Sequence, residues 1–573
     1  MIRQLVPLVL VVGLSAAGRS CSPGNIPGEE LLQKGPAAGG GGVQTGGVAV
    51  SGRFLYEKVA IVASAAGVVQ PRTTTSLPVR LVDVVALDGT TRQEIHLAPA
   101  ATDETGNFTV RVPTQKTFTI CLKSSTQVSA SRVNVEVRDP FTASYYLFEV
   151  VDGNTGGPFS PAAGISSMTL STVTIKATPS STRLSAVTSI LDAALKASDR
   201  FREVQGTPPS LVTFYWNPAS TDGSYSVVSG GPGGVPAIFV RGGNSDRDNT
   251  DEFDDFVLHH EYGHCAAWLA SRDSSLGGSH GLDDSLYPTL AYSEGLASFV
   301  AGVVEGTPAL TDSAGITGST PQTFVVNLEG GRAAGAVRGM RSECSVFEVL
   351  WDLVDGVEGR PNSDGETIGL TFAQVFTALV NLRQTALYVV VQDFLTALTN
   401  TGAITVPTVQ GLLLSPENQN ITFPAPDSGG DAFPTRIVYG SSTDDTCATR
   451  VAIATDANDG VDVSNRFFKF TVTDDIPVTV SMALSGADGT NAQGTNLDML
   501  VLTTDNALAT DLTGATLTPF PRPERYTETA SGLLRGPNRT YLVYVSGRPD
   551  LSAGTLTNTS SNTVTYTLSL STP

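Results

Sequence analysis

The sequence predicts a multidomain protein with an N-terminal β-sandwich, a central α+β domain that is mainly helical around a cluster of histidines, and a C-terminal β-sandwich. Length is the first observation, since 573 residues with 40% hydrophobic side chains can fill two to four cores. Apolar and polar residues alternate in residues 47–181 and again in 428–573, which is typical of strands. Between these regions, in 182–427, apolar residues recur at helical spacing.

Residues 1–20 have the pattern of a secretory signal peptide. A basic residue precedes an apolar run that is too short to span a bilayer, and small residues follow the run. Ala16 and Gly18 suit an ordinary signal peptidase, whereas Cys21 and the Gly-rich tether after it resemble the start of a bacterial lipoprotein. Residues 21–46 are expected to form a flexible linker. Both alternatives imply a protein that is secreted or held at the bacterial cell-envelope surface.

The chain is strongly acidic, with a formal net charge of -20 and a pI near 4.6. This charge argues against binding to nucleic acid or to an anionic membrane surface. After the signal peptide, no stretch has the roughly 18 apolar residues that a transmembrane helix needs. We therefore expect membrane contact only through a lipid on Cys21.

The cysteines are odd in number, with five in the chain. Lipidation of Cys21 would leave four, which are Cys121, Cys265, Cys344 and Cys447. Cys265 and Cys344 fall on predicted helices of the central region and could form a disulfide. Cys121 and Cys447 fall in different predicted domains and could equally be buried free thiols.

Residues 47–181 contain segments with strand patterns separated by turn residues, among them GVAVSGRFLY, TFTICLKS and SRVNVEVRD. The stretch PVRLVDVVALDGT, followed by TDETGNFTVRVP, resembles the carboxypeptidase-regulatory, transthyretin-like β-sandwich that is found beside secreted enzymes. The resemblance implies a β-sandwich that accompanies an enzyme.

Residues 182–427 mix helices and strands. The segment LSAVTSILDAALKASDRF has apolar residues at helical spacing, and the strand-like pieces LVTFYW and PAIFVRGG follow it. Further helices are predicted at 288–305, 343–355, 371–382 and 387–399. Because β-rich segments bound this region, we expect it to fold without its neighbours.

Residues 428–573 return to the strand pattern. A segment RFFKFTV precedes a segment PVTVSM, and this order resembles the bacterial pre-peptidase C-terminal sandwich. The resemblance implies a second accessory β-sandwich at the end of the chain.

Three of the five histidines lie in DEFDDFVLHHEYGHCAAWLA, residues 251–270. The segment is predicted to be a helix, and the acidic residues of its opening turns complement the helix dipole. His260 and His264 lie one turn apart on one face, so both imidazoles can reach one ion at about 2.0–2.1 Å. Glu261 is then placed to hold a metal-bound water and take its proton. The pattern is HExxH, and it predicts a zinc site.

A catalytic zinc site needs a third protein ligand and one open position. Metzincins are excluded, because Ala267 and Ala270 stand where that family has glycine and histidine. An aspartate of GLDDS, either Asp283 or Asp284, is one alternative. Glu294 is the best candidate, because it lies in the apolar predicted helix LAYSEGLASFVAG, where a lone carboxylate needs a partner.

The combination of HExxH with a downstream SEGLASF helix resembles the gluzincin metallopeptidases, and the segments from SILDAAL to SVFEVLWDLVDG resemble a group of secreted bacterial members of that class. The resemblance implies zinc ligands at His260, His264 and Glu294, and a general base at Glu261. Two features depart from the thermolysin branch. The interval between the second histidine and Glu294 is longer, and Ser298 stands where that branch has an aspartate that supports a ligand histidine.

Peptide hydrolysis also needs a hydrogen-bond donor for the developing oxyanion. His280, in the Gly-rich loop LGGSHGLDD, is the first candidate, ahead of Tyr287 and Tyr292; a surface or supporting role for it is the alternative. His259 is expected to be structural, because it points about 100° away from His260 on the helix. The segment PAIFVRGG could be an edge strand on which an extended peptide lies, or an ordinary strand of a sheet.

Two functions are consistent with the sequence. The first is a secreted or surface-anchored zinc metallopeptidase that acts on peptide or protein substrates with Glu261 as the base. The alternative is a non-catalytic surface binding or scaffold protein that retains a zinc-binding domain between two sandwiches. Glu261 favours the first, because a structural zinc site needs no base and normally closes its fourth position with a protein ligand.

Overall fold

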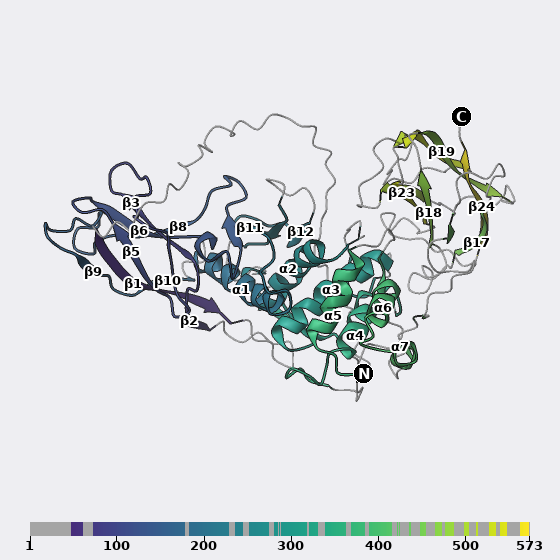
Figure 1. Cartoon of the computed structure of the whole chain (residues 1–573), viewed down its shortest axis with the longest axis horizontal. Coiled ribbons are helices and arrows are strands. Elements are labelled where there is room, and N and C mark those ends of the chain that lie inside the picture. Colours follow the sequence, from purple (N-terminus) through teal and green to yellow (C-terminus); the bar gives the residue numbers. More distant parts are fainter. Residues whose placement is uncertain are drawn as a thin grey trace.

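The computed structural model describes most of residues 47–423 and, from 435 to 571, the strands alone (Figure 1). The residues between 47 and 423 that it does not describe are 61–72, 178–182, 229–234, 244–250, 274, 276–279, 285, 287, 318–319, 330–337, 363–367, 384–388, 415–420 and 422. The expected signal peptide and linker, with Cys21, therefore lie outside the described residues. Within the described part, no helix is both long and apolar enough to cross a membrane.

Two sheets form the N-terminal part. In the first, β1 (Val48–Val59) pairs with β2 (Thr74–Pro78), β5 (Asn107–Val112), β9 (Ser167–Thr169) and β10 (Val173–Ile175). The second has the order β4-β3-β6-β8, made of β4 (Ala100–Ala101), β3 (Asp83–Asp88), β6 (Phe118–Lys123) and β8 (Leu147–Val150), with the short 3-10 helix η1 (Gln127–Ser129) after β6. Alternate residues of β5 are buried, and both sheets contribute to one core, so this part is β-sandwich-like.

The central part begins with a four-stranded sheet of order β12-β13-β11-β7. The strand-like pieces expected from LVTFYW and PAIFVRGG are present as β11 and β13. Both β7 and β13 run parallel to β11, while β12 runs antiparallel to β13. The strands are β7 (Val135–Arg138), β11 (Val212–Trp216), β12 (Tyr225–Val227) and β13 (Ala237–Val240). Since β7 precedes residue 182, this sheet crosses the expected boundary between the first two domains.

Helix α1 (Ser185–Gln205) is joined to the N-terminal part by ion pairs. Asp192 accepts a hydrogen bond from Arg80 Nε at 2.8 Å. Asp199 accepts two hydrogen bonds from the guanidinium of Arg132, at 3.1 and 3.0 Å. Paired hydrogen bonds between a guanidinium and a carboxylate fix orientation as well as distance. The helix is thereby oriented on the sandwich, and its apolar face belongs to the same hydrophobic core.

The rest of the central part is mainly helical (Figure 1). The four helices predicted from residue 288 onward are present as α3 to α6, and α3 packs against both α2 and α4. The hairpin β14–β15 was not among the predicted elements. The elements are η3 (Asp251–Phe253), α2 (Asp255–Ala270), α3 (Pro288–Glu305), β14 (Ala309–Thr317), β15 (Thr320–Asn327), α4 (Glu343–Asp352), α5 (Phe372–Leu382), α6 (Val391–Asn400) and α7 (Val406–Leu413).

The disulfide considered between Cys265 and Cys344 is wrong. Both thiols are free and buried. Helix α3 separates the two helices that carry them, and the Cys344 thiol instead lies 3.5 Å from the carbonyl oxygen of Leu282. Cys121 is also a buried free thiol, as the other alternative had it.

Two further sheets form the C-terminal part. The segment RFFKFTV lies in β18 and PVTVSM lies in β19, and these consecutive strands belong to different sheets. One sheet has the order β16-β18-β23-β20, with β16 (Thr435–Arg436), β18 (Asn465–Val472), β23 (Arg539–Ser546) and β20 (Asp498–Thr503). The other has the order β17-β24-β19-β22-β21, with β17 (Cys447–Ile453), β24 (Asn562–Ser571), β19 (Ile476–Ser485), β22 (Thr527–Leu534) and β21 (Leu512–Thr513).

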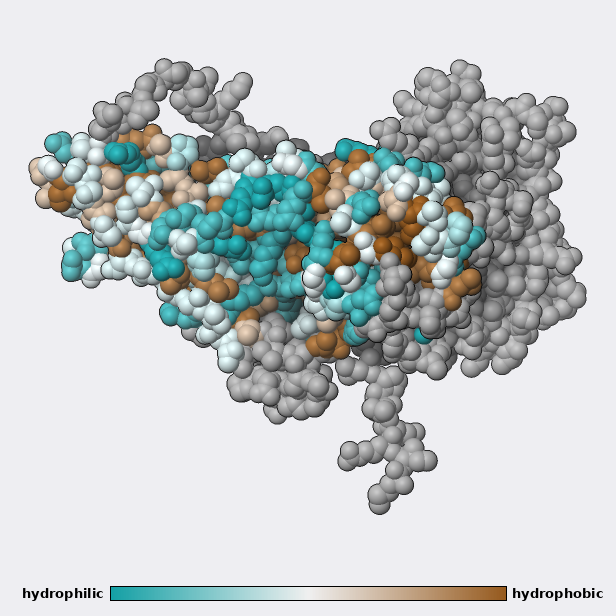
Figure 2. Space-filling model, turned by 60° about the horizontal axis from the view of Figure 1, so that its bottom comes forward, coloured by the Kyte–Doolittle hydropathy of each residue, from teal (hydrophilic) through white to brown (hydrophobic). Residues whose placement is uncertain are grey.

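On the face drawn in Figure 2, hydrophilic residues gather in a broad patch near the middle of the described surface, and hydrophobic residues gather to the right of this patch. Two of the most exposed large hydrophobic side chains, Phe141 and Leu414, are 67% and 84% exposed and lie far apart in the chain. Most large apolar side chains are instead in one core that extends from the sandwich into the helices. The sandwich and the helical part therefore share buried surface as well as a sheet.

This shared sheet and core change the expectation that residues 182–427 fold alone. A chain of residues 182–427 lacks β7 and exposes the edge of β11 and the sandwich-facing side of α1, so we expect it to aggregate or to unfold without a cooperative transition. A chain of residues 47–427 should unfold cooperatively, as measured by calorimetry and circular dichroism. Cooperative unfolding of 182–427 at the same temperature would contradict this prediction.

Candidate metal centre

Helix α2 carries both histidines of the HExxH pattern. It begins after Asp254, whose backbone is extended, and Asp255 lies in its first turn, where a carboxylate complements the helix dipole. His260 and His264 follow on the face that packs against α3. His264 is 7% exposed, and the His260 side chain is 17% exposed. One imidazole is thus buried, and the other stays accessible from solvent.

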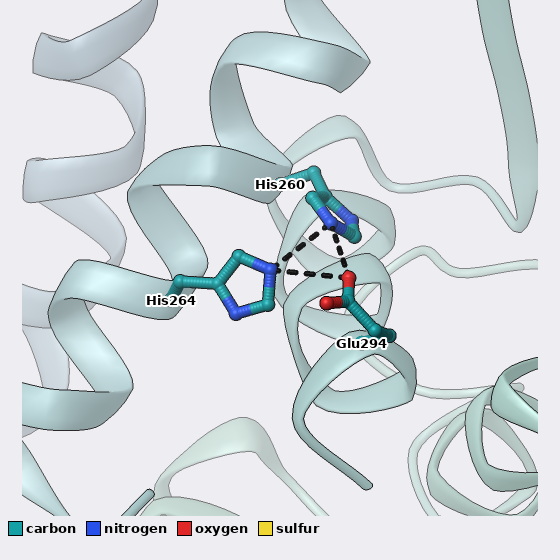
Figure 3. Close-up of side chains that lie close together, drawn as sticks. All are labelled: His260, His264 and Glu294. Atoms are coloured by element: carbon teal, nitrogen blue, oxygen red, sulfur yellow. Dashed lines mark hydrogen bonds and ion pairs between the residues drawn. The ribbon is translucent and has the colours of Figure 1, made fainter. Parts of the chain in front are cut away.

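Glu294 of α3 meets the two histidines (Figure 3). Its Oε2 lies 3.1 Å from His260 Nε2 and 3.2 Å from His264 Nε2, and the two Nε2 atoms lie 3.2 Å apart. The three atoms thus form a nearly equilateral triangle, in which every atom can act as a metal ligand. The structure brings together the three residues expected from the sequence, although Glu294 is thirty residues after His264.

The triangle has the size that a zinc ion requires. Ligand atoms at about 2.0–2.1 Å from a tetrahedral ion lie roughly 3.3–3.4 Å from one another, close to the 3.1–3.2 Å found here. Two imidazoles and one carboxylate are also a donor set that catalytic zinc sites use, with the fourth position open. The residues present therefore fit a zinc ion.

Hydroxyl groups of α3 orient both imidazoles. Ser298 Oγ lies 3.0 Å from His260 Nδ1, and Ser293 Oγ lies 3.2 Å from His264 Nδ1. Ser293 in turn donates a hydrogen bond to Asp273 at 2.8 Å, so its oxygen is left to accept a proton from Nδ1. A proton on Nδ1 leaves the lone pair of Nε2 for a metal. Ser298 was singled out in the sequence, whereas Ser293 and Asp273 were not.

The charges of the triangle stabilise one another. Burial raises the pKa of Glu294, but the charge of His264 and hydrogen bonds from His260, His264 and His280 outweigh burial and hold the pKa well below its usual range. Burial lowers the pKa of His264, but the neighbouring Glu294 carboxylate raises it to about 9. Without a metal, the buried carboxylate is therefore ionised and paired with an imidazolium.

Glu261 is buried beside the triangle. It is 2% exposed, and within the described residues its Oε2 has no hydrogen-bond partner. Burial raises the pKa of Glu261, while the nearby His260 and His264 and the Ser226 side chain of β12 oppose this rise. Glu261 is thus a buried carboxylate with one unpaired oxygen, and it lies close enough to His260 and His264 for their charges to act on it.

His280 is buried and not part of an open surface loop, since it is 7% exposed. Its Nε2 lies 3.5 Å from Glu294 Oε2 and 3.3 Å from Glu343 Oε2, at the start of α4. Burial lowers the pKa of His280, but its two carboxylate partners raise it to about 12. His280 is therefore a protonated donor next to the triangle. The sequence did not indicate Glu343, because a glutamate in the first turn of a helix is also expected for the helix dipole alone.

The other candidates fall elsewhere. Asp283 and Asp284 are exposed, and neither belongs to a metal-binding group found among the described residues. Tyr287 lies outside the described residues. Tyr292 is 1% exposed, and its ring is tilted against that of Phe394, with 6.4 Å between ring centroids.

His259 is structural, as expected. It is fully buried, its Nε2 lies 2.9 Å from the carbonyl oxygen of Ala193, and its Nδ1 lies 2.6 Å from Glu305. The strand PAIFVRGG is not an edge strand, because β13 pairs with β11 on one side and with β12 on the other. Among the described strands, β12 forms that edge of the sheet, and it packs against α2.

No family model matches the chain, and no curated protein matches it. Among solved structures, the chain is similar to the pre-peptidase C-terminal domain of collagenase from Bacillus anthracis, with 12% identity over 24% of this chain and 94% of that domain, and a TM-score of 0.15. That domain is of the class that the tail resembles in sequence. At this TM-score the likeness supports no inference about activity, so the site geometry alone must support a function.

We predict that Ser293→Ala weakens zinc binding by about 10–100-fold, because the hydroxyl that orients His264 and satisfies Asp273 is lost. Competition with a chromophoric chelator measures the affinity. Ser198→Ala is the matched control, since Ser198 is a buried serine of α1 that donates a hydrogen bond to the carbonyl oxygen of Arg132. Unchanged affinity in Ser293→Ala would show that this hydroxyl does not support the ligand.

Proposed function

We propose that the chain is a zinc-dependent metallopeptidase of the gluzincin type that hydrolyses peptide bonds in peptide or protein substrates. The observation that carries the proposal is Glu261, a buried carboxylate with an unpaired oxygen that interacts electrostatically with all three of the converging ligands. In this proposal the protein acts as a secreted enzyme or as one held at the cell surface by a lipid on Cys21. The terminal β-sandwiches are accessory domains of the carboxypeptidase-regulatory and pre-peptidase C-terminal types.

The proposed mechanism gives a role to five residues of this chain. His260, His264 and Glu294 would hold the zinc ion, which when bound would act as a Lewis acid on the scissile carbonyl and on the attacking water. Glu261 accepts the proton of the attacking water and delivers it to the leaving amine. His280, whose Nε2 lies 3.3 Å from Glu343, donates a hydrogen bond to the oxygen on which negative charge develops.

The edge of the central sheet gives the substrate a place to bind. Strand β12 packs against α2, and Ser226 on this strand interacts with Glu261. An extended peptide that pairs with the free edge of β12 would pass beside the candidate base, and its main chain would be held by sheet hydrogen bonds. We therefore propose β12 as the strand that binds the substrate, in place of β13, the segment PAIFVRGG that the sequence suggested.

We predict one zinc ion per chain in the wild type. In Glu294→Ala the zinc affinity should fall by well over 100-fold, because the substitution removes a metal ligand, whereas Ser293→Ala removes only a residue that supports a ligand. Metal analysis after dialysis measures this loss. Glu305→Ala, at the end of the same helix, should keep its zinc. Full zinc in Glu294→Ala with loss in His280→Ala instead would assign the third ligand to His280.

We predict that Glu261→Gln keeps its zinc and its melting temperature but hydrolyses a peptide library about 10²–10⁴-fold more slowly, because an amide cannot accept the proton of water at neutral pH. Glu203→Gln, an exposed glutamate of α1, is the control for the same chemical change. The scaffold alternative expects no hydrolysis in the wild type. Hydrolysis that survives in Glu261→Gln would place the base elsewhere.

A further inference from the structure

A second group of buried carboxylates lies before the zinc-binding turns of α2. Asp251 belongs to η3, Asp254 precedes the first residue of α2, and Asp312 belongs to β14. Each offers one oxygen, and the three oxygens lie within 4.8 Å of one another. The residues are 5%, 2% and 8% exposed. Three carboxylates are thus enclosed in one place, apart from the His260–His264–Glu294 triangle.

Hydrogen bonds satisfy only some of these oxygens. Asp251 Oδ2 accepts from the Ser224 hydroxyl at 2.6 Å, and Asp254 Oδ2 accepts from the amide and hydroxyl of Ser313 at 2.9 and 2.6 Å. In contrast, Asp251 Oδ1 and Asp312 Oδ1 are buried, and neither has a hydrogen-bond partner among the described residues. Native proteins rarely bury carboxylate oxygens in this way unless a cation or a donor meets them.

The cations that the structure describes around the cluster do not balance its charge. Glu252, fully buried, lies 3.2 Å from Arg183, and Arg241 is the cation that acts on Asp251. Among the described residues, four carboxylates therefore face two guanidinium groups, and the negative charge that remains in this group equals the charge of one divalent cation. In the absence of a cation the cluster must take up protons, since burial and the charges of the neighbouring carboxylates raise the pKa of Asp251 to about 8 and the pKa of Asp312 well above its usual range.

We propose that Asp251, Asp254 and Asp312 bind one calcium ion. All three side-chain ligands are carboxylate oxygens, which are hard donors that suit calcium or magnesium and not zinc. Calcium accepts irregular coordination at 2.3–2.6 Å, whereas magnesium needs a near-ideal octahedron at 2.0–2.1 Å. Carboxylates from a 3-10 turn, a helix start and a hairpin, two of them already fixed by serine hydrogen bonds, suit the more tolerant ion.

The proposed ion would fasten the start of α2 to the hairpin β14–β15. Asp254 of the cluster and Thr311, the residue before Asp312, line a hollow of about 290 Å³. Because the cluster shares no residue with the zinc triangle, calcium binding does not depend on the proposed peptidase activity. Its role is to stabilise the helix that carries His260 and His264.

Calcium titration of the full zinc-loaded chain tests the proposal. With calcium at about 100 times its Kd, we expect the melting temperature to rise by about 3–4 °C, because the sandwich and the helical part unfold as one large unit. Isothermal titration should show that Asp312→Asn and Asp251→Asn each bind one calcium ion fewer per chain than the wild type, with zinc content unchanged. Two asparagine variants are used so that misfolding of one leaves the other as a test.

Asp83→Asn is the matched control, because Asp83 is a buried aspartate of the N-terminal sandwich, 4% exposed, that bonds the Ser125 hydroxyl. It should keep the calcium stoichiometry and the calcium-dependent rise of the wild type. No calcium binding by the wild type, or equal stoichiometry in the wild type and both cluster variants, would overturn the proposal. An equal response to magnesium would overturn the assignment to calcium.

Discussion

The burial of one carboxylate, Glu294, governs the arrangement of the central part. Helix α3 is enclosed over almost its whole length, and an ionised side chain there is very unfavourable unless opposite charge and hydrogen bonds meet it. His260 and His264 meet it from α2, and His280 meets it from the loop between the two helices. The position of α3 relative to α2 is therefore fixed by a polar contact inside an apolar interface, and any ligand set in this region depends on that contact.

Small residues allow the helices to come close enough for this contact. A Cβ on Gly263 would lie 3.1 Å from the carbonyl oxygen of Ala297 on α3. A Cβ on Gly295 would lie 2.6 Å from Val346 Cγ1 and 2.7 Å from the Glu343 carbonyl oxygen. Gly263 on α2 lets α3 approach that helix, and Gly295 on α3 lets α3 approach α4. Glu294 thus lies on a helix that fits closely between its two neighbours. Larger residues would separate the helices by more than a metal-ligand distance tolerates.

The candidate ligands could be predicted because their signals are local. His260 and His264 share one helical face, and Glu294 is a lone carboxylate in an apolar helix. The residues that support the ligands could not be predicted. Asp273 and Glu343 have no distinctive sequence pattern, and their contacts form only when segments far apart in the chain come together. The domain boundary could not be predicted for the same reason. The sequence of β7 indicates a strand but not its partner, and only the folded chain shows that β7 pairs with β11.

Polar contacts also fix the faces of α2 that do not point at Glu294. Asp255 pairs with Lys58 of β1 and, at 2.9 Å, with Lys196 of α1, while His259 bonds the Ala193 carbonyl oxygen of α1. Apolar packing alone tolerates small rotations of a helix, whereas these directional contacts from several sides do not. A site whose ligands must converge within about 0.5 Å needs such support. Lys58 belongs to the N-terminal sandwich. The sandwich therefore contacts and orients α2, the helix that carries His260 and His264, directly.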